Sequence, residues 1–147
     1  MIRKAQKKKP ISRSENMARI RAQNTAIEQS LRKELWRRGL RYRKNDKTVF
    51  GKPDIVFKTL KIAVFCDSEF WHGKKYLKGE IPKRNRDFWI KKFENNIKRD
   101  NLVNKRLRKS GWTVIRIWET DIKKNVKKCA NRIEATIKKV RGQSDLH

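Results

Sequence analysis

The 147-residue sequence is short of cysteine, of long apolar runs and of acidic side chains. Its two cysteines, Cys66 and Cys129, are far apart and form no Cys-x-x-Cys pair, which excludes a disulfide framework. The apolar run over residues 62–66 is far shorter than the roughly 20 residues that a membrane span needs. No apolar secretory core follows the first residues, so we expect a reducing, cytoplasmic location and no membrane.

Acidic residues number 15 against 42 lysines and arginines, which gives a formal net charge of +27. A folded chain tolerates such self-repulsion best when its partner is a polyanion. Nucleic acid is the default partner, because lysine and arginine side chains placed on phosphates release counterions. Five tryptophans and six phenylalanines argue against a disordered chain. The alternatives are a merely soluble basic protein and a ribosome-bound one.

Hydrophobic periodicity predicts one α/β domain with elements in the order αα-βββ-α-β-α. We expect a basic arm over 1–13, the domain over 14–141 and a tail over 142–147. Helices are predicted at 14–23, 26–38, 87–109 and 122–140, and strands at 40–43, 55–57, 62–65 and 112–118. Residues 67–86 lack a period and carry six basic side chains after residue 73, which is typical of a functional loop.

Asp54 stands out because it precedes an apolar strand, in the run Gly51-Lys52-Pro53-Asp54. A carboxylate there costs desolvation unless it binds a cation or several donors. A hard cation takes such an oxygen, and a backbone carbonyl can supply a second one. A turn-capping aspartate after proline explains the residue equally well.

Three further side chains are candidates for chemistry. His72 is one of two histidines and could serve as a general base, although a surface histidine is the simpler interpretation. Glu28 lies beside a helical apolar stripe, where it either supports catalysis or forms a capping box with Thr25. Asp100 lies one helical turn after Asn96, and an exposed helix charge is its alternative.

Aromatic pairs flank the basic loop, at Phe70-Trp71 and Phe88-Trp89. Such side chains can wedge between base steps or stack on bases, and core packing is the alternative. Pro-Asp before a strand resembles the PD-(D/E)xK nuclease signature, yet the next strand carries no acid-x-Lys pair.

Taken together, the segments resemble the very-short-patch-repair endonuclease family from about Ser12 to Ile137. The order and spacing of several short pieces carry the resemblance. These are Arg13-Ser14-Glu15-Asn16-Met17, Asn24-Thr25-Ala26-Ile27-Glu28, Gly51-Lys52-Pro53-Asp54, Phe70-Trp71-His72, Phe88-Trp89, Asn96 with Asp100, Gly111-Trp112 and Trp118-Glu119.

The resemblance implies a PD-(D/E)xK-like (restriction-endonuclease-like) core, with a mixed sheet flanked by helices. It implies an Mg²⁺-dependent enzyme that nicks one strand of double-stranded DNA beside a T:G mismatch. Asp54 and the backbone carbonyl of Cys66 match the metal ligands, His72 the catalytic histidine, and Glu28 and Asp100 further acids. The expected DNA contacts are Phe70, Trp71, Trp89, Lys74, Lys75, Lys83, Arg84 and Arg86.

The sequence departs from the bacterial members that hold a structural zinc. The matching positions are Glu69, Lys74, about Tyr76 and Thr120, and two distant cysteines with two histidines cannot supply four ligands. We therefore expect no structural zinc, and a bacterial or phage-encoded enzyme that is a monomer in solution. A homing or restriction nuclease that cuts undamaged DNA is the alternative, followed by a non-catalytic DNA-binding module.

Overall fold

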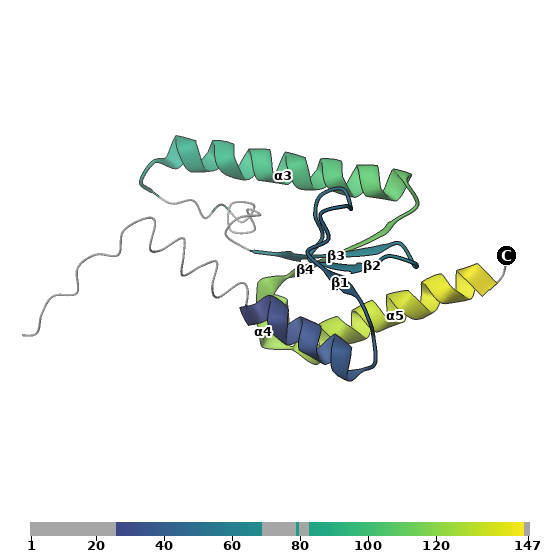
Figure 1. Cartoon of the computed structure of the whole chain (residues 1–147). Coiled ribbons are helices and arrows are strands. Elements are labelled where there is room, and N and C mark those ends of the chain that lie inside the picture. The colour runs from purple at the N-terminus through teal and green to yellow at the C-terminus, as the bar shows by residue number, and fades with distance from the viewer. Residues whose placement is uncertain (1–25, 69–78, 80–82, 146–147) are drawn as a thin grey trace, which may run out of the picture.

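The computed structural model of the chain describes residues 26–68, 79 and 83–145 (Figure 1). A helix over 26–37 comes first. The further elements are β1 (Arg43–Lys44), β2 (Ile55–Phe57), β3 (Ile62–Asp67), α3 (Arg86–Lys109), β4 (Thr113–Trp118), α4 (Glu119–Lys124) and α5 (Val126–Asp145). No helix in this described part is both long enough and apolar enough to cross a membrane.

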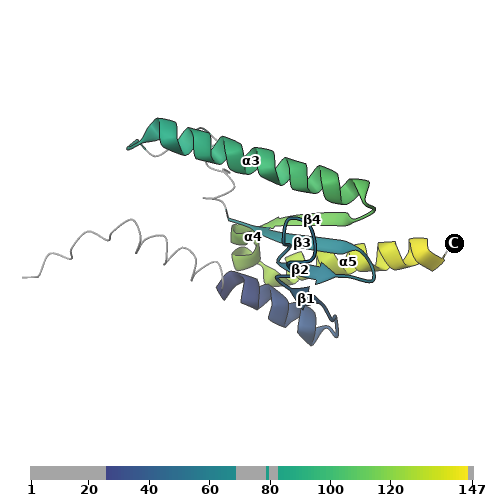
Figure 2. The ribbon, with the colours of Figure 1, turned by 45° about the horizontal axis from the view of Figure 1, so that its top comes forward.

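The four strands form one mixed sheet in the order β1-β2-β3-β4. β2 pairs antiparallel with both β1 and β3, whereas β3 and β4 are parallel. α3 lies over one face of the sheet, and the 26–37 helix, α4 and α5 lie over the other (Figures 1 and 2). The expected α/β architecture, a mixed sheet flanked by helices, is thereby confirmed.

Side chains of β3 alternate between two hydrophobic clusters, because successive residues of a strand face opposite sides. Ile62, Val64 and Cys66 pack with the 26–37 helix, α4 and α5. Ala63 and Phe65 pack with α3. All six residues of β3 are buried, so this strand is the centre of the fold and fixes the positions of both helical layers.

Most predicted elements lie within a few residues of the observed ones. β3 continues beyond the predicted end at residue 65 to Asp67, and α3 starts at Arg86 rather than at 87. The strand expected over 40–43 is reduced to Arg43–Lys44. The 14–23 helix and most of the 67–86 loop lie outside the described residues.

The prediction of one helix over 122–140 is wrong, because the chain breaks at Asn125 between α4 and α5. Asn125 has an extended backbone, with φ −157° and ψ 87°. Its Oδ1 accepts a hydrogen bond from the backbone N–H of Lys128 at 3.1 Å, which is how a capping side chain starts a new helix. α5 then continues past residue 141 to Asp145.

Arg38 joins the 26–37 helix to α5. Its guanidinium donates to Glu34 at 3.0 Å, Asn131 at 2.7 Å and Glu134 at 3.0 Å. Hydrogen bonds from Arg37 and Arg38 lower the pKa of Glu34 to about 2. This network fixes the helix that carries Glu28 against the rest of the domain.

Gly51 lets the loop before β2 approach α3 closely. Its φ is +80°, and an added Cβ would overlap the Val103 side chain. Gly51→Ala combines left-handed strain with overpacking, so we expect the free energy of unfolding to fall by about 2–5 kcal/mol. Gly39 is the matched control, because it has φ +81° and nothing within 4 Å of an added Cβ.

Denaturant unfolding of both glycine variants measures the difference between strain alone and strain with overlap. Gly39→Ala should cost only about 1–2 kcal/mol. Equal losses in the two variants would mean that the Gly51 loop is free to move away from α3.

Candidate active site

Asp54 is anchored in the sheet by its backbone and by its side chain. Its N–H donates to the carbonyl of Val64 at 3.0 Å, and its carbonyl accepts from the N–H of Asn45 at 3.1 Å. One carboxylate oxygen, Oδ2, accepts from the N–H of Cys66 at 2.7 Å. The carboxylate therefore has a fixed position beside the end of β3, as a metal ligand requires.

Negative charges gather around Cys66. Burial raises the pKa of its thiol well above the usual value, and the charges of Asp54, Glu28, Glu119 and Asp67 raise it further. The thiol therefore stays protonated and is no nucleophile. Any contribution of Cys66 to the site therefore comes from its backbone.

Glu28 is held in an environment that disfavours its ionised form. Burial raises its pKa to about 7, the charge of Asp54 adds to the rise, and Arg32 opposes it. Arg32 Nη1 lies 3.7 Å from Glu28 Oε2. Two carboxyl groups from distant parts of the chain thus interact at one site, which is typical of a functional site.

The raised pKa of Glu28 makes stability depend on pH. The unfolded carboxyl ionises near 4.5, whereas the folded one keeps its proton to about 7. Stability therefore falls as pH rises from 4.5 to 7 and is level above, with a total loss of up to about 3 kcal/mol. Glu28→Gln stays neutral, so it should match the wild type at pH 4.5 and exceed it at pH 8.

Denaturant unfolding in a chelating buffer at both pH values measures this difference. Asp87→Asn, which replaces an exposed acid in the first turn of α3, is the control and should give no gain in stability at pH 8. A Glu28→Gln variant that is no more stable than the wild type at pH 8 would contradict the raised pKa of Glu28.

A groove of about 780 Å³ lies between the loop before β2, the end of β3 and α3. Three acids line it, Asp54, Asp67 and Asp100. Cations line it as well, namely Lys47, Lys52, Arg99 and Arg116. The structure thus brings the predicted acids Asp54 and Asp100 to one groove, flanked by side chains that can bind phosphate.

Arg116 of β4 connects the two further acids of the groove. Its Nη1 lies 2.9 Å from Asp67 Oδ1 and 3.6 Å from Asp100 Oδ1. Its Nε donates to Asn104 at 2.6 Å, and its guanidinium lies 4.2 Å from the centre of the Phe65 ring. Sequence reasoning missed Arg116 and Asp67. The sequence contained a signal for both, because each is a charged residue in an otherwise apolar strand, on the side that faces α3.

Among the predicted DNA contacts, Lys83 and Arg84 are exposed just before α3, and Arg86 is exposed at its first position. Trp89 is half-buried and stacks on buried Phe93, with ring centroids 5.7 Å apart. Its neighbour Phe88 is 48% exposed, so the more accessible ring of this pair is Phe88.

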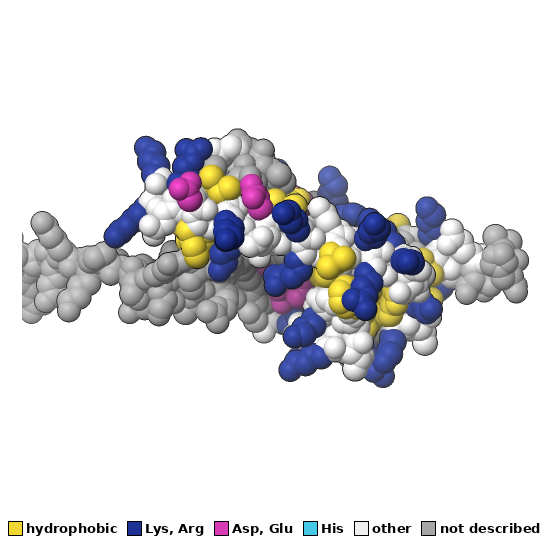
Figure 3. Space-filling view, turned by 90° about the horizontal axis from the view of Figure 1, so that it is seen from above, with side chains coloured by type: hydrophobic (Ala, Val, Ile, Leu, Met, Phe, Trp, Pro, Cys, Tyr) yellow, Lys and Arg dark blue, Asp and Glu magenta, His cyan; other side chains and the backbone are white. Residues whose placement is uncertain are grey.

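Lysine and arginine side chains cover the outer face of α3. Seen from this side, they are spread over the described surface, and acidic side chains are few by comparison (Figure 3). The exposed cations of α3 are Arg86, Lys91, Lys98, Arg99, Lys105, Arg106, Arg108 and Lys109. This face matches the charge of a DNA backbone.

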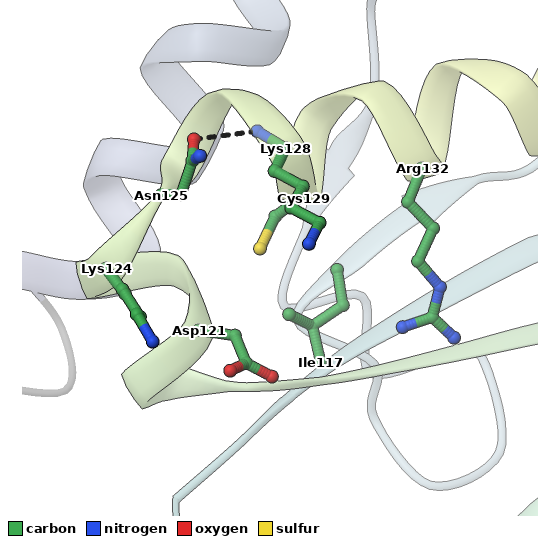
Figure 4. Close-up of a pocket in the computed structure, with 7 residues that line it drawn as sticks. All are labelled: Ile117, Asp121, Lys124, Asn125, Lys128, Cys129 and Arg132. Carbon is green, nitrogen blue, oxygen red and sulfur yellow. Dashed lines mark hydrogen bonds between the residues drawn. The ribbon is translucent and has the colours of Figure 1, made fainter.

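Besides the groove, a basic pocket of about 520 Å³ lies on the opposite side of the sheet, between β4, α4 and α5 (Figure 4). Lys124, Lys128 and Arg132 line it together with Asp121. Arg132 donates to the carbonyl of Arg116 at 3.1 Å, which covers part of the free edge of β4. No predicted site residue lies here.

Several predicted site residues fall outside the described residues, namely His72, Phe70, Trp71, Lys74 and Lys75. Thr25, the proposed capping partner of Glu28, does so too. Among the residues that are described, no three His, Cys, Asp or Glu side chains lie close enough together to hold a metal ion by themselves.

Comparison with known proteins identifies the family. Residues 5–78 match the family described as DNA mismatch endonuclease Vsr. Over 137 residues, the chain is 46% identical to the type II nicking enzyme V.NmeDIP of Neisseria meningitidis serogroup C, covering 92% of each chain.

Two further relatives are similar over most of the domain. The type II nicking enzyme V.HpaIIP of Haemophilus parainfluenzae is 48% identical over 77% of this chain and 81% of its own. The DNA mismatch endonuclease Vsr of Escherichia coli strain K12 is 34% identical over 74% of this chain and 69% of its own. The chain therefore belongs to the Vsr family of DNA mismatch endonucleases, with a restriction-endonuclease-like fold, and is a DNA endonuclease.

Proposed function

We propose that this protein is an Mg²⁺-dependent endonuclease that nicks one strand of double-stranded DNA beside a T:G mismatch, as the first step of very-short-patch repair. The observation that carries the proposal is the anchored carboxylate of Asp54, which lines a cation-flanked groove and interacts with Glu28. The names of the relatives agree, since they describe a mismatch endonuclease and nicking enzymes.

The residues around Asp54 fit a divalent cation. Burial is the main cause of the raised pKa of Glu28 and the like charge of Asp54 adds to it, and a cation beside Asp54 would relieve this second cause. The donors are oxygen atoms, which Mg²⁺ prefers to nitrogen or sulfur. Asp54 and the backbone carbonyl of Cys66 would hold the ion in a PD-(D/E)xK-like core.

Each proposed catalytic residue then has one task. Bound Mg²⁺ supplies charge neutralisation on the scissile phosphate and the leaving oxygen. His72 takes a proton from the attacking water, because its ordinary pKa is near neutrality. Glu28 orients His72, and Asp100 shapes the groove through Arg116.

DNA is held through its backbone and opened by aromatic side chains. Exposed cations at and just before the start of α3, including Lys83, Arg84 and Arg86, are suited to phosphates, and we assign Lys74 and Lys75 to the same task. We propose that Phe70, Trp71 and Trp89 wedge into the duplex. Opening a step costs a few kcal/mol and is cheaper at a mismatch, which favours the mismatched substrate.

We further propose that the enzyme acts without structural zinc, as a cytoplasmic monomer of a bacterium or phage. Both cysteines are buried in the same hydrophobic cluster, so packing accounts for them. The relatives named above are bacterial.

End-labelled duplexes, one perfectly paired and the others carrying each mismatch, test the proposal. With Mg²⁺ we expect nicks in the T:G duplex alone, and EDTA should stop turnover without unfolding the protein. Equal cleavage of paired DNA would indicate a homing or restriction nuclease. Binding with no Mg²⁺-dependent cleavage would indicate a DNA-binding module, and cooperative unfolding in EDTA would indicate a structural metal.

A further inference from the structure

A third hollow, of about 550 Å³, lies between the 26–37 helix and β1, away from the groove described above. Two aromatic rings, those of Trp36 and Tyr42, form part of its wall. The cations around them are Arg32, Lys33, Arg37 and Lys44. A hollow lined by both rings and cations has the composition of sites that bind nucleotides.

Trp36 is unusual among the large apolar side chains because 53% of it is exposed. Its ring is held in place despite this exposure. Arg41 lies 3.6 Å from the ring centroid and donates to the carbonyl of Trp36 itself at 3.1 Å. The ring of Tyr42 meets it edge-to-face at 6.2 Å. Arg41 covers one face of the ring and does not line the hollow, so the ring is fixed from outside the hollow and a ligand there would meet it at little further cost in side-chain entropy.

The cations at the rim are also held by the fold. Arg37 donates to Glu34 through Nη2 at 2.6 Å and through Nε at 3.0 Å. The hydroxyl of Tyr42 donates to the carbonyl of Arg32 at 3.0 Å, which joins the strand side of the hollow to the helix side. The two walls of the hollow are therefore preformed.

Each wall of the hollow is linked to one of the proposed catalytic acids through a neighbouring residue. Arg32, which lines it, pairs with Glu28 at 3.7 Å. Lys44, on the other wall, precedes Asn45, whose N–H donates to the carbonyl of Asp54. The hollow and the proposed cleavage site are therefore built on the same helix and on the same segment around β1.

We propose that this hollow binds an unpaired nucleotide of the cleaved DNA strand, with its base on Trp36 and its phosphate among Lys33, Arg37 and Lys44. A paired base presents only its edges in the grooves, whereas an unpaired one offers its face for stacking. Cleavage creates strand ends that can unpair, so the hollow retains the product. This inference rests on the endonuclease activity and is independent of mismatch specificity and of Mg²⁺.

Fluorescence anisotropy in EDTA, where no cleavage occurs, tests the proposal. The probes are a single-stranded oligothymidylate of about 12 nucleotides, a nicked duplex with a short unpaired flap, and the same duplex intact. Trp36→Ala should weaken binding of the first two probes by about tenfold. Trp36→Phe, which keeps a flat ring, should restore most of the loss, and binding of the intact duplex should stay unchanged.

Leu102→Ala is the matched control, since Leu102 is 57% exposed on α3, outside the hollow. It should not reproduce the roughly tenfold loss of single-strand and flap binding that is expected for Trp36→Ala. Lys33→Gln should reduce the salt dependence of single-strand binding by about 0.7 in the log–log slope, whereas Lys128→Gln in the pocket of Figure 4 should not.

Two results would overturn the proposal. One is unchanged single-strand binding by Trp36→Ala, and the other is equal weakening for the intact duplex. Thermal unfolding of each variant shows that the fold is intact. Because these assays contain no metal, cleavage of the mismatch duplexes by the wild type remains a separate test of the proposed function.

Discussion

Asp54→Asn is expected to abolish cleavage of the mismatched duplex while DNA binding persists. The asparagine can still accept the hydrogen bond from the Cys66 N–H, so the loop keeps its anchor. What is lost is the negative charge that would hold the divalent cation. A bound metal supplies several kcal/mol of transition-state stabilisation, so the nicking rate should fall at least about a thousandfold.

Two further measurements separate this loss from misfolding. Removing the charge of Asp54 also removes one cause of the raised pKa of Glu28, so the variant should be as stable as the wild type or more stable at pH 8. Binding to intact duplex should be equal or tighter, because one charge that repels phosphate has gone. Asp121→Asn, in the pocket of Figure 4, is the control and should nick at the wild-type rate.

Retained nicking by Asp54→Asn would remove Asp54 from the metal site. Loss of duplex binding together with nicking would show instead that the carboxylate maintains the DNA-binding surface. The single-turnover nicking rate and the duplex affinity, measured on one protein preparation, distinguish these outcomes.

Two acids of the groove, Asp54 and Asp100, were named from the sequence as candidate site residues. Asp54 breaks an apolar context directly, and Asp100 was expected on its helix. The structure places both on one groove. Their proposed roles in catalysis remain predictions.

Long-range pairing could not be predicted in this way. Arg116 and Asp67 are 49 positions apart, and only the parallel register of β3 and β4 brings them to one face. A single sequence indicates which side chains of a strand share a face, but it does not indicate which strands are neighbours. The family resemblance, and not the strand pattern, was what assigned Glu28 and Asp54 to the same site.

The break at Asn125 was not predicted, for a different physical reason. Ile122 of α4 and Cys129 of α5 belong to the same hydrophobic cluster, so the apolar spacing continues across the break. Periodicity reports which side chains are buried and not whether the backbone hydrogen bonds are continuous. The capping side chain of Asn125 was the only local sign.

Arg116→Met is expected to destabilise the protein strongly. The arginine places one cation between Asp67 and Asp100, whose side chains are only 9% and 18% exposed. Removing the cation from such a pair costs about 3–5 kcal/mol, because buried carboxylates lose their counter-charge. Asn104 loses its donor at the same time.

A second substitution identifies the cause of that loss. Asp67→Asn in the Arg116→Met background should recover part of the stability, since it removes one of the buried charges. Denaturant unfolding of the single and the double variant measures both effects.

Lys98→Met, an exposed cation on the same helix as Asp100, is the control and should change stability by less than about 0.5 kcal/mol. An Arg116→Met loss that Asp67→Asn does not reduce would point to lost packing on Phe65 rather than lost charge. Asp67 directly follows Cys66, whose backbone carbonyl is the proposed second metal ligand. Loosening the end of β3 should slow nicking in Arg116→Met even where the protein remains folded, and Asp67→Asn in that background should not restore the rate.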